Sequence, residues 1–228
     1  MGSIAVFAGG FGSGKSEVAL NYAMDKARDS TQVVLADLDL VNPYFVSRSL
    51  KAELNEKGIT LIAPGGDFSF GDVPNIPARL LAYVRQDNHM IIDLAGDEVG
   101  SVVLGYISQM VGQRSAVELF LVINPYRPFA GDLESISELK ANLERATRMA
   151  FTGIVSNPNL VEASDLETII QGHSMVEAYA RSLGLPVSYL AVEEHFYAEL
   201  SPIYGNLLRK IQLYLRPNWL QDLYKGGM

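Results

Sequence analysis

Short apolar runs alternate with longer segments of helical spacing along most of the chain. Short apolar runs bounded by turn residues are typical of buried strands, whereas apolar residues three or four positions apart indicate an amphipathic helix. Strands are predicted at residues 4–8, 32–36, 60–63, 90–93, 117–123, 151–156 and 186–192. Helices are predicted at residues 17–29, 45–54, 101–111, 133–149 and 165–183, and at 202–224 with an interruption at Pro217.

This alternation predicts an α/β fold with a mostly parallel sheet, helices on both faces and right-handed crossovers. The length of 228 residues suits one domain over residues 1–228, and neither an internal repeat nor a linker divides the chain. Asp132 stands directly before the helical pattern at 133–149, where a short acidic side chain caps the first turn.

The connection between the first strand and the first helix carries the strongest chemical pattern. Residues 9–16 read GGFGSGKS, which matches the phosphate-binding P-loop G-x-x-x-x-G-K-[ST] in the strand-to-helix context that it requires. Glycines let backbone amides curl around phosphate oxygens, and the following helix points its positive end at them. Lys15 is expected to reach the β- and γ-phosphates, and the Ser16 hydroxyl to bind Mg²⁺.

Two later strands deliver aspartates to the same edge of the sheet. The strand at 32–36 leads into Asp37 and Asp39, and the strand at 90–93 ends in Asp93, with Gly96 three residues later. The carboxyl ends of parallel strands form the ligand edge of an open α/β sheet. Beside a P-loop, Asp93 is interpreted as the acidic position near Mg²⁺ and Gly96 as the glycine whose amide contacts the γ-phosphate.

Composition narrows the classes of function. Acidic residues outnumber basic ones by 26 to 18, and the net charge of −8 disfavours nucleic acid and anionic lipid as partners. The lack of cysteine excludes disulfides, thiolate chemistry and cysteine-held zinc or iron–sulfur clusters. No apolar run reaches the roughly 18 residues of a membrane span. With no signal-peptide pattern at its start, the protein is expected to be cytoplasmic.

The P-loop, the two aspartate-bearing strand ends and the loop at Asn157 together resemble the MinD/ParA/CobQ–CobB superfamily of P-loop NTPases, which belongs to the SIMIBI class. The resemblance implies a three-layer P-loop NTPase fold, with Mg²⁺ near Ser16, Asp37 and Asp93. It also implies that Asp37 or Asp39 positions the attacking water and that Asn157 hydrogen-bonds the base.

The expected site follows from the motif and the resemblance together. The expected nucleotide contacts are Gly10, Phe11, Gly12, Ser13, Gly14, Lys15, Ser16, Glu17, Gly96 and Asn157. The expected catalytic residues are Lys15, Asp37 and Asp39, and the expected Mg²⁺ ligands are Ser16, Asp37 and Asp93.

One position departs from the family pattern. MinD/ParA-type ATPases carry an additional lysine that reaches the phosphates of the partner subunit, and this chain has Gly10 there. The departure puts the nucleotide-sandwich homodimer in question, although a homodimer stays among the expected assemblies. Arg48 and Arg127 are alternative sources of the charge, and a surface salt bridge is the alternative role for either arginine.

The loop at residues 156–159 reads SNPN and lacks the N-K-x-D pattern with which P-loop GTPases read guanine. ATP is favoured over GTP, because an asparagine amide can pair with the amino group and ring nitrogen of adenine. The leading hypothesis is a Mg²⁺-dependent ATPase whose nucleotide state switches an unknown protein partner. The alternatives are an ATP-dependent synthetase or kinase, a GTPase, and a nucleotide-binding scaffold with negligible hydrolysis. In the synthetase or kinase, residues 64–77 and 124–127 would bind the small-molecule acceptor.

Overall fold

The structure, a computed structural model, describes residues 2–38, 51–62, 78–94 and 98–215. Its strands form one eight-stranded sheet in the order β3-β2-β4-β1-β5-β6-β7-β8, in which every neighbouring pair is parallel. The strands are β1 (Ile4–Ala8), β2 (Val33–Asp37), β3 (Ile59–Ile62), β4 (His89–Asp93), β5 (Val117–Ile123), β6 (Gly153–Ser156), β7 (Val187–Glu193) and β8 (Leu208–Ile211).

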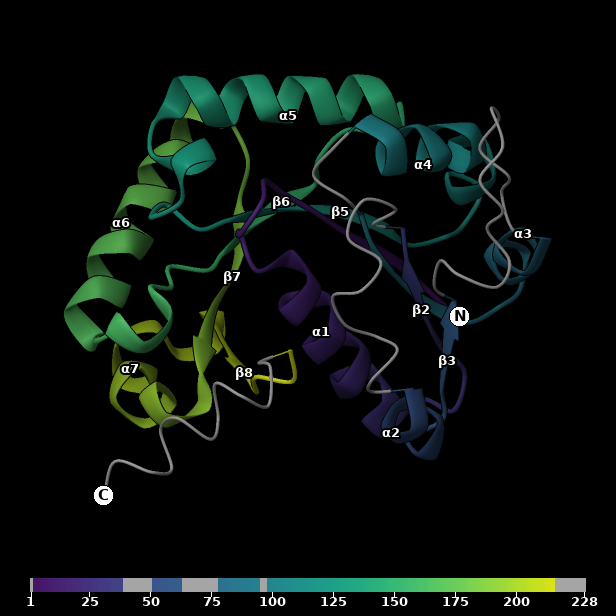
Figure 1. Cartoon of the computed structure of the whole chain (residues 1–228), viewed down its shortest axis with the longest axis horizontal. Coiled ribbons are helices and arrows are strands. Elements are labelled where there is room, and N and C mark those ends of the chain that lie inside the picture. The colour runs from purple at the N-terminus through teal and green to yellow at the C-terminus, as the bar shows by residue number, and fades with distance from the viewer. Residues whose placement is uncertain (1, 39–50, 63–77, 95–97, 216–228) are drawn as a thin grey trace.

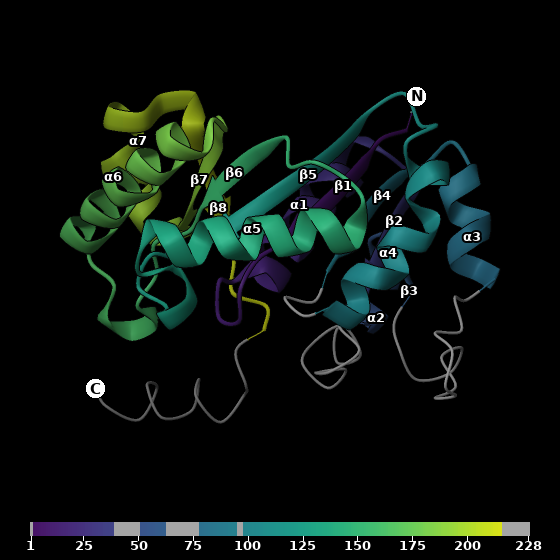
Figure 2. The ribbon, with the colours of Figure 1, turned by 90° about the horizontal axis from the view of Figure 1, so that it is seen from above.

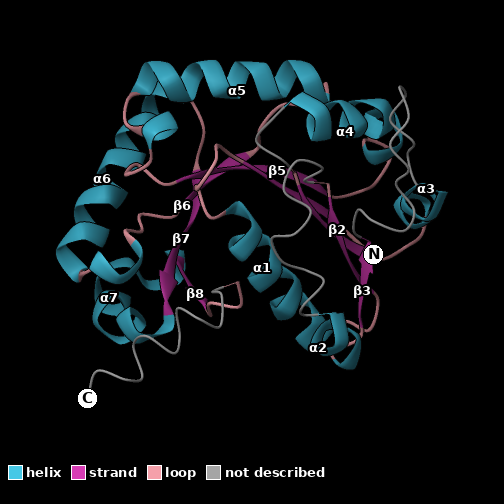
Figure 3. Ribbon diagram, viewed as in Figure 1, coloured by secondary structure: helices cyan, strands magenta, loops and turns pink. Residues whose placement is uncertain are grey.

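Helices cover both faces of this sheet, as Figures 1 and 3 show. One face carries α1 (Lys15–Asp29) and α2 (Lys51–Glu56), and the other carries α3 (Ala78–Arg85), α4 (Glu98–Val111), α5 (Leu133–Thr147), α6 (Leu166–Leu183) and α7 (Tyr197–Tyr204). Figure 2 shows α3, α4, α5 and α6 following one another across the second face. Short 3₁₀ turns lie at η1 (Pro128–Ala130), η2 (Val161–Ala163), η3 (Glu194–Phe196) and η4 (Gly205–Leu207). The predicted three-layer α/β architecture is confirmed.

The central strand β1 shows why consecutive residues of a strand in this sequence are all apolar. Its residues Ile4, Val6 and Ala8 pack in the core shared with α3, α4, α5 and α6. Its residues Ala5 and Phe7 pack in the core on the α1 face. Because successive strand residues point to opposite faces and both faces are covered, every position of β1 is apolar and buried.

The predicted helix at 202–224 is wrong in its described C-terminal part. Helix α7 ends at Tyr204, and β8 then adds an edge strand to the sheet. Leu208 and Ile211 are three residues apart, which imitates helical spacing. In a strand an odd separation puts them on opposite faces, and both are buried here, Leu208 with α7 and Ile211 with α1. Sheet pairing therefore overrides the local pattern.

Helix α3 and the N-terminal cap of α5 can also be compared with the prediction. Helix α3 was not predicted, although Leu80 and Val84 supply the apolar face that buries it. The predicted cap of α5 is confirmed, because the Asp132 carboxylate accepts a hydrogen bond from the Ser135 amide at 2.7 Å. No helix in the described ranges is both long enough and apolar enough to span a bilayer.

Candidate functional site

The P-loop joins the central strand β1 to the first residue of α1 through a backbone path that requires glycine. Gly12 and Gly14 have φ angles of 76° and 83°, a left-handed conformation that glycine adopts freely. A Cβ at Gly9 would lie 2.4 Å from the Val122 carbonyl oxygen of β5, so the loop and the neighbouring strand approach too closely for a side chain. Gly14 is the N-cap residue and no side chain caps α1, as is suitable for a helix N-terminus that binds an anion.

Two buried carboxylates stand beside this loop. Asp37 and Asp93 are direct partners across the parallel strands β2 and β4, and Asp93 is in register with Phe7 at the end of β1. Leu35 and Ile91, two residues earlier on the same strands, pack on the α1 face of the sheet. The period of two therefore puts both carboxylates on the α1 face as well. Their exposed fractions are 8% and 7%, so two buried carboxyl groups lie side by side at the carboxyl edge of the sheet.

The residues at this edge fit a magnesium ion that is shared with phosphate. Mg²⁺ is usually bound through one or two carboxylates, together with substrate phosphates and several waters. Asp37 and Asp93 supply carboxylates, and Ser16 supplies a hydroxyl in the first turn of α1. Among the described residues, no group of three or more His, Cys, Asp or Glu side chains is placed to hold a metal. The arrangement thus suits a cation whose remaining ligands come from a nucleotide.

Three asparagines connect the P-loop to the loops that follow β5 and β6. Asn157, in the loop after β6, donates through Nδ2 to the Ser13 carbonyl at 2.7 Å. Asn124, at the end of β5, donates to the Asn159 carbonyl at 2.7 Å and accepts from the Tyr126 amide at 3.2 Å. Asn124 and Asn157 are both buried. The three loops therefore form one hydrogen-bonded unit.

This unit gives Asn157 a structural contact in addition to the base contact that the resemblance implies. The amide nitrogen of Asn157 braces the P-loop, which was not expected from its position in the loop at 156–159. Asn124 was expected only in the lining of a possible acceptor pocket, and its hydrogen bonds to Asn159 and Tyr126 were not predicted.

The other P-loop side chains differ in their exposure to solvent. Phe11 is 73% exposed at the surface of the loop, whereas Ser13 and Lys15 are buried. Arg127, in the loop after β5, lies over Gly12: a Cβ added to Gly12 would be 3.3 Å from the Cδ atom of Arg127. An arginine from another strand end thus covers the phosphate-binding loop.

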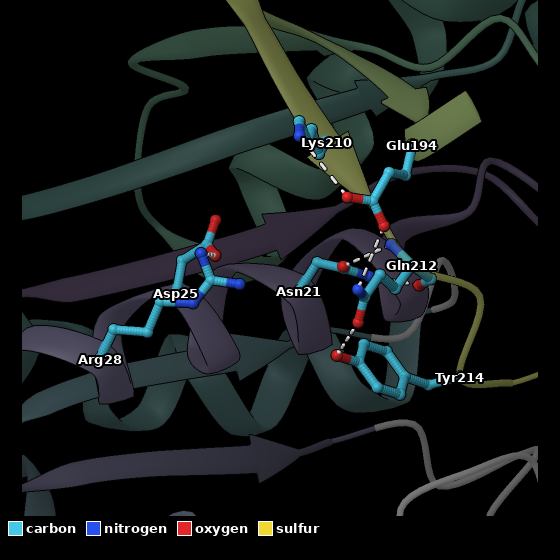
Figure 4. Close-up of polar contacts among 7 residues, drawn as sticks. All are labelled: Asn21, Asp25, Arg28, Glu194, Lys210, Gln212 and Tyr214. Atoms are coloured by element: carbon cyan, nitrogen blue, oxygen red, sulfur yellow. Dashed lines mark hydrogen bonds and ion pairs between the residues drawn. The ribbon is translucent and has the colours of Figure 1, made fainter. Parts of the chain in front are cut away.

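Glu17, expected among the nucleotide contacts, is bound to the C-terminal part of the chain. Its two carboxylate oxygens accept hydrogen bonds from the amides of Tyr214 and Leu215, at 2.7 and 3.2 Å. One turn further along α1, Asn21 donates to the Gln212 carbonyl at 2.9 Å and accepts from the Gln212 amide at 2.8 Å. Figure 4 shows Asn21, Gln212 and Tyr214 side by side along α1. We call residues 212–215 the C-terminal strap.

Several expected features lie outside the described residues. These are the catalytic candidate Asp39, the glycine Gly96, the loop at 64–77 and the arginine Arg48.

Comparisons with known proteins bear on the fold. No family model and no curated protein matches the sequence. Among solved structures, chloroplast FtsY from Physcomitrella patens matches with a TM-score of 0.57 and 17% identity, over 85% of this chain and 59% of that one. The signal recognition particle receptor FtsY from Elizabethkingia anophelis matches with a TM-score of 0.51 and 17% identity, over 85% and 60% of the two chains. The cell division protein FtsY from Thermotoga maritima matches with a TM-score of 0.50 and 19% identity, over 85% and 63%.

The fold is that of a P-loop NTPase. These matches span only 59–63% of the three FtsY chains, so they concern one part of each protein. The similarity concerns the fold alone, and membership of the SIMIBI class and of the MinD/ParA group stays a prediction.

Proposed function

We propose that this chain is a Mg²⁺-dependent ATPase that binds ATP at the P-loop and acts as a nucleotide-dependent switch for a protein partner. The observation that carries the proposal is the conformation of residues 9–16. Glycines with positive φ lead straight into the uncapped start of α1, beside the buried pair Asp37 and Asp93. The P-loop NTPase fold, shared with FtsY, supports nucleotide binding at this edge.

The proposed chemistry consists of positioning and charge neutralisation. Loop amides and the Lys15 ammonium hold the phosphates, and Ser16, Asp37 and Asp93 hold Mg²⁺, which neutralises phosphate charge. Asp37 is the described carboxylate that orients the attacking water, and Asp39 shares this role in the proposal. Asp37 is buried on the α1 face of the sheet, and this position supports the proposed role.

The preference for ATP rests on the loop at Asn157. This loop lacks the lysine and the aspartate with which P-loop GTPases read guanine. The Asn157 nitrogen donates to Ser13, so Oδ1 is the atom that would accept a hydrogen bond from the amino group of adenine. The net charge of −8 favours a protein partner over nucleic acid.

Binding of fluorescent ATP and GTP analogues to the purified chain tests this proposal. With Mg²⁺ present, the wild type should bind the ATP analogue and prefer it over the GTP analogue. Lys15→Ala should bind at least about tenfold more weakly, since it removes a buried cation from the phosphate site. Lys57→Ala is the matched control, because Lys57 is exposed at the end of α2 and far along the sequence from the loop.

Three results would overturn parts of the proposal. Equal binding by the wild type and Lys15→Ala would contradict a phosphate site at the P-loop. A preference for the GTP analogue would replace the ATPase with a GTPase. Hydrolysis that stays near zero until a small-molecule acceptor is added would replace the switch with a synthetase or kinase.

A further inference from the structure

The P-loop lacks the additional lysine at Gly10, so the proposed ATPase needs another positive charge at the phosphates. Lys15 is the only lysine in residues 9–16, and hydrolysis spreads negative charge over the transferred phosphoryl group and the leaving oxygen. A second cation in a water-poor site stabilises that charge strongly, because the local dielectric constant is low.

Arg127 is in contact with the loop at the required place. A Cβ built on Gly12 would lie 3.3 Å from Cδ and 3.4 Å from Nε of Arg127, so the arginine arm packs directly on the phosphate-binding backbone. Gly10 and Arg127 also line the same small cavity, with a volume of about 10 Å³. The arginine therefore borders the residue at which MinD/ParA-type ATPases carry their lysine.

The guanidinium of Arg127 has no structural partner in the described part of the chain. Its Nε atom is buried and makes no hydrogen bond. None of the ion pairs between described residues includes Arg127, so the surface salt bridge considered from the sequence has no support there. A buried guanidinium N–H without a partner is costly, and a bound phosphate oxygen would satisfy it.

The backbone of Arg127 is held in place by the same asparagine that joins the three loops. The Arg127 amide donates to the Asn124 carbonyl at 3.2 Å, and the Arg127 carbonyl accepts from the Ala130 amide at 2.9 Å. The Asn124 side chain is in turn bonded to the loop that braces Ser13 of the P-loop. Arg127 is thus fixed relative to the P-loop before any ligand binds, which reduces the entropic cost of a phosphate contact.

We propose that Arg127 is a catalytic residue that contacts the nucleotide phosphates from within the same chain and supplies the charge missing at Gly10. This inference rests on the proposed ATPase function. In hydrolysis, the water oxygen forms a bond to the γ-phosphorus and the bond to the bridging oxygen breaks. The bridging oxygen keeps the electron pair as part of ADP, and the protons of the water end on phosphate and solvent. Arg127 gives and takes no proton, and it stabilises the developing negative charge.

The test compares three substitutions at Arg127 with a control. Arg127→Met keeps an unbranched apolar arm over Gly12 and removes the charge, whereas Arg127→Ala removes both. Arg127→Lys keeps the positive charge but replaces the planar guanidinium and its several N–H donors with a single ammonium group. Arg145→Ala is the matched control, because Arg145 is exposed on α5 and its side chain bonds only Asn142 among the described residues.

Steady-state hydrolysis and calorimetric binding of ADP with and without aluminium fluoride are the two readouts. We expect Arg127→Met to lower kcat by about 100-fold or more, with ADP affinity within about threefold of the wild type. The wild type should bind ADP with aluminium fluoride more tightly than ADP alone, and Arg127→Met should lose this difference. Arg127→Lys should keep part of the wild-type kcat and part of the tighter binding with aluminium fluoride. Arg145→Ala should match the wild type.

The outcomes separate this inference from the proposed function. If the wild type binds no ATP, or Lys15→Ala behaves like the wild type, the proposed function itself fails. If Lys15→Ala is impaired while Arg127→Met keeps the wild-type kcat and the aluminium fluoride effect, only the role of Arg127 is refuted. Equal losses of ADP affinity and kcat in Arg127→Met would also refute it, since they would show a structural role. If wild-type turnover is too slow to measure, the binding comparison alone decides.

Discussion

The attachment of the C-terminal strap to α1 can be tested by replacing one atom. Glu17 accepts hydrogen bonds from the Tyr214 and Leu215 amides through its two carboxylate oxygens. In Glu17→Gln, one charged oxygen becomes a neutral acceptor and the other becomes an NH₂ group, which faces a backbone N–H instead of accepting from it. One hydrogen bond is therefore weakened and the other is lost.

The expected loss follows from the charge of the acceptor. A hydrogen bond to a charged group contributes about 1.5–3 kcal/mol and a neutral one about 0.5–1.5 kcal/mol. Both contacts of Glu17 are partly exposed, so the lower end of each range applies. We therefore expect Glu17→Gln to weaken the attachment of the strap by about 2.5 kcal/mol, which corresponds to about a 70-fold larger opening equilibrium.

Native-state hydrogen exchange measures this opening at the two amides concerned. The Tyr214 and Leu215 amides should exchange about 70-fold faster in Glu17→Gln than in the wild type, while amides of the central strand β1 keep their rates. Glu134→Gln is the matched control, because Glu134 is also an acidic residue in the first turn of a helix. If Tyr214 and Leu215 exchange at the wild-type rate, or equally fast in the control, Glu17 does not hold the strap.

Three further changes test other parts of the structure. Asn157→Ala removes the 2.7 Å hydrogen bond to Ser13, so ATP-analogue binding should weaken by about tenfold in a fluorescence titration. Gly105→Ala would put a Cβ 2.3 Å from the Ala146 carbonyl, and this overpacking between α4 and α5 should cost about 1–3 kcal/mol in denaturant unfolding. Burial lowers the pKa of His173 below its ordinary value of 6.5, so the unfolded chain binds the proton more tightly. Stability from this group is present above about pH 6.5 and is lost as the pH falls below that value, so His173→Gln should flatten that part of the stability profile.

The parts of the fold that were predicted correctly depend on local patterns. The strand β1, the P-loop and the helix α1 follow one another within the first residues of the chain, and each has its own signal in the sequence. The pair Asp37 and Asp93 was also predicted to lie at the ligand edge, because aspartates at the ends of parallel strands must meet there. Neither result needed knowledge of a contact between distant residues.

The features that were missed depend on such contacts. The strand β8 forms because β7 offers an edge, and nothing in the local spacing of its apolar residues distinguishes it from a helix. The partners of Glu17 are almost two hundred residues away in sequence, at Tyr214 and Leu215, and they are backbone amides that any residue type provides. The position of Arg127 over Gly12 likewise comes from the order of strands in the sheet, in which β5 lies next to β1.

Helix geometry explains how one turn of α1 serves both the P-loop and the C-terminal strap. Successive residues of an α-helix point about 100° apart, so Ser16 and Glu17 leave α1 in different directions. The Glu17 carboxylate is turned to the strap, whereas Ser16 is the expected Mg²⁺ ligand. Because the two residues share a continuous helical backbone, a ligand that displaces the first turn of α1 also displaces the acceptor of the Tyr214 and Leu215 amides. The strap is therefore connected to the proposed phosphate site through the first turn of α1.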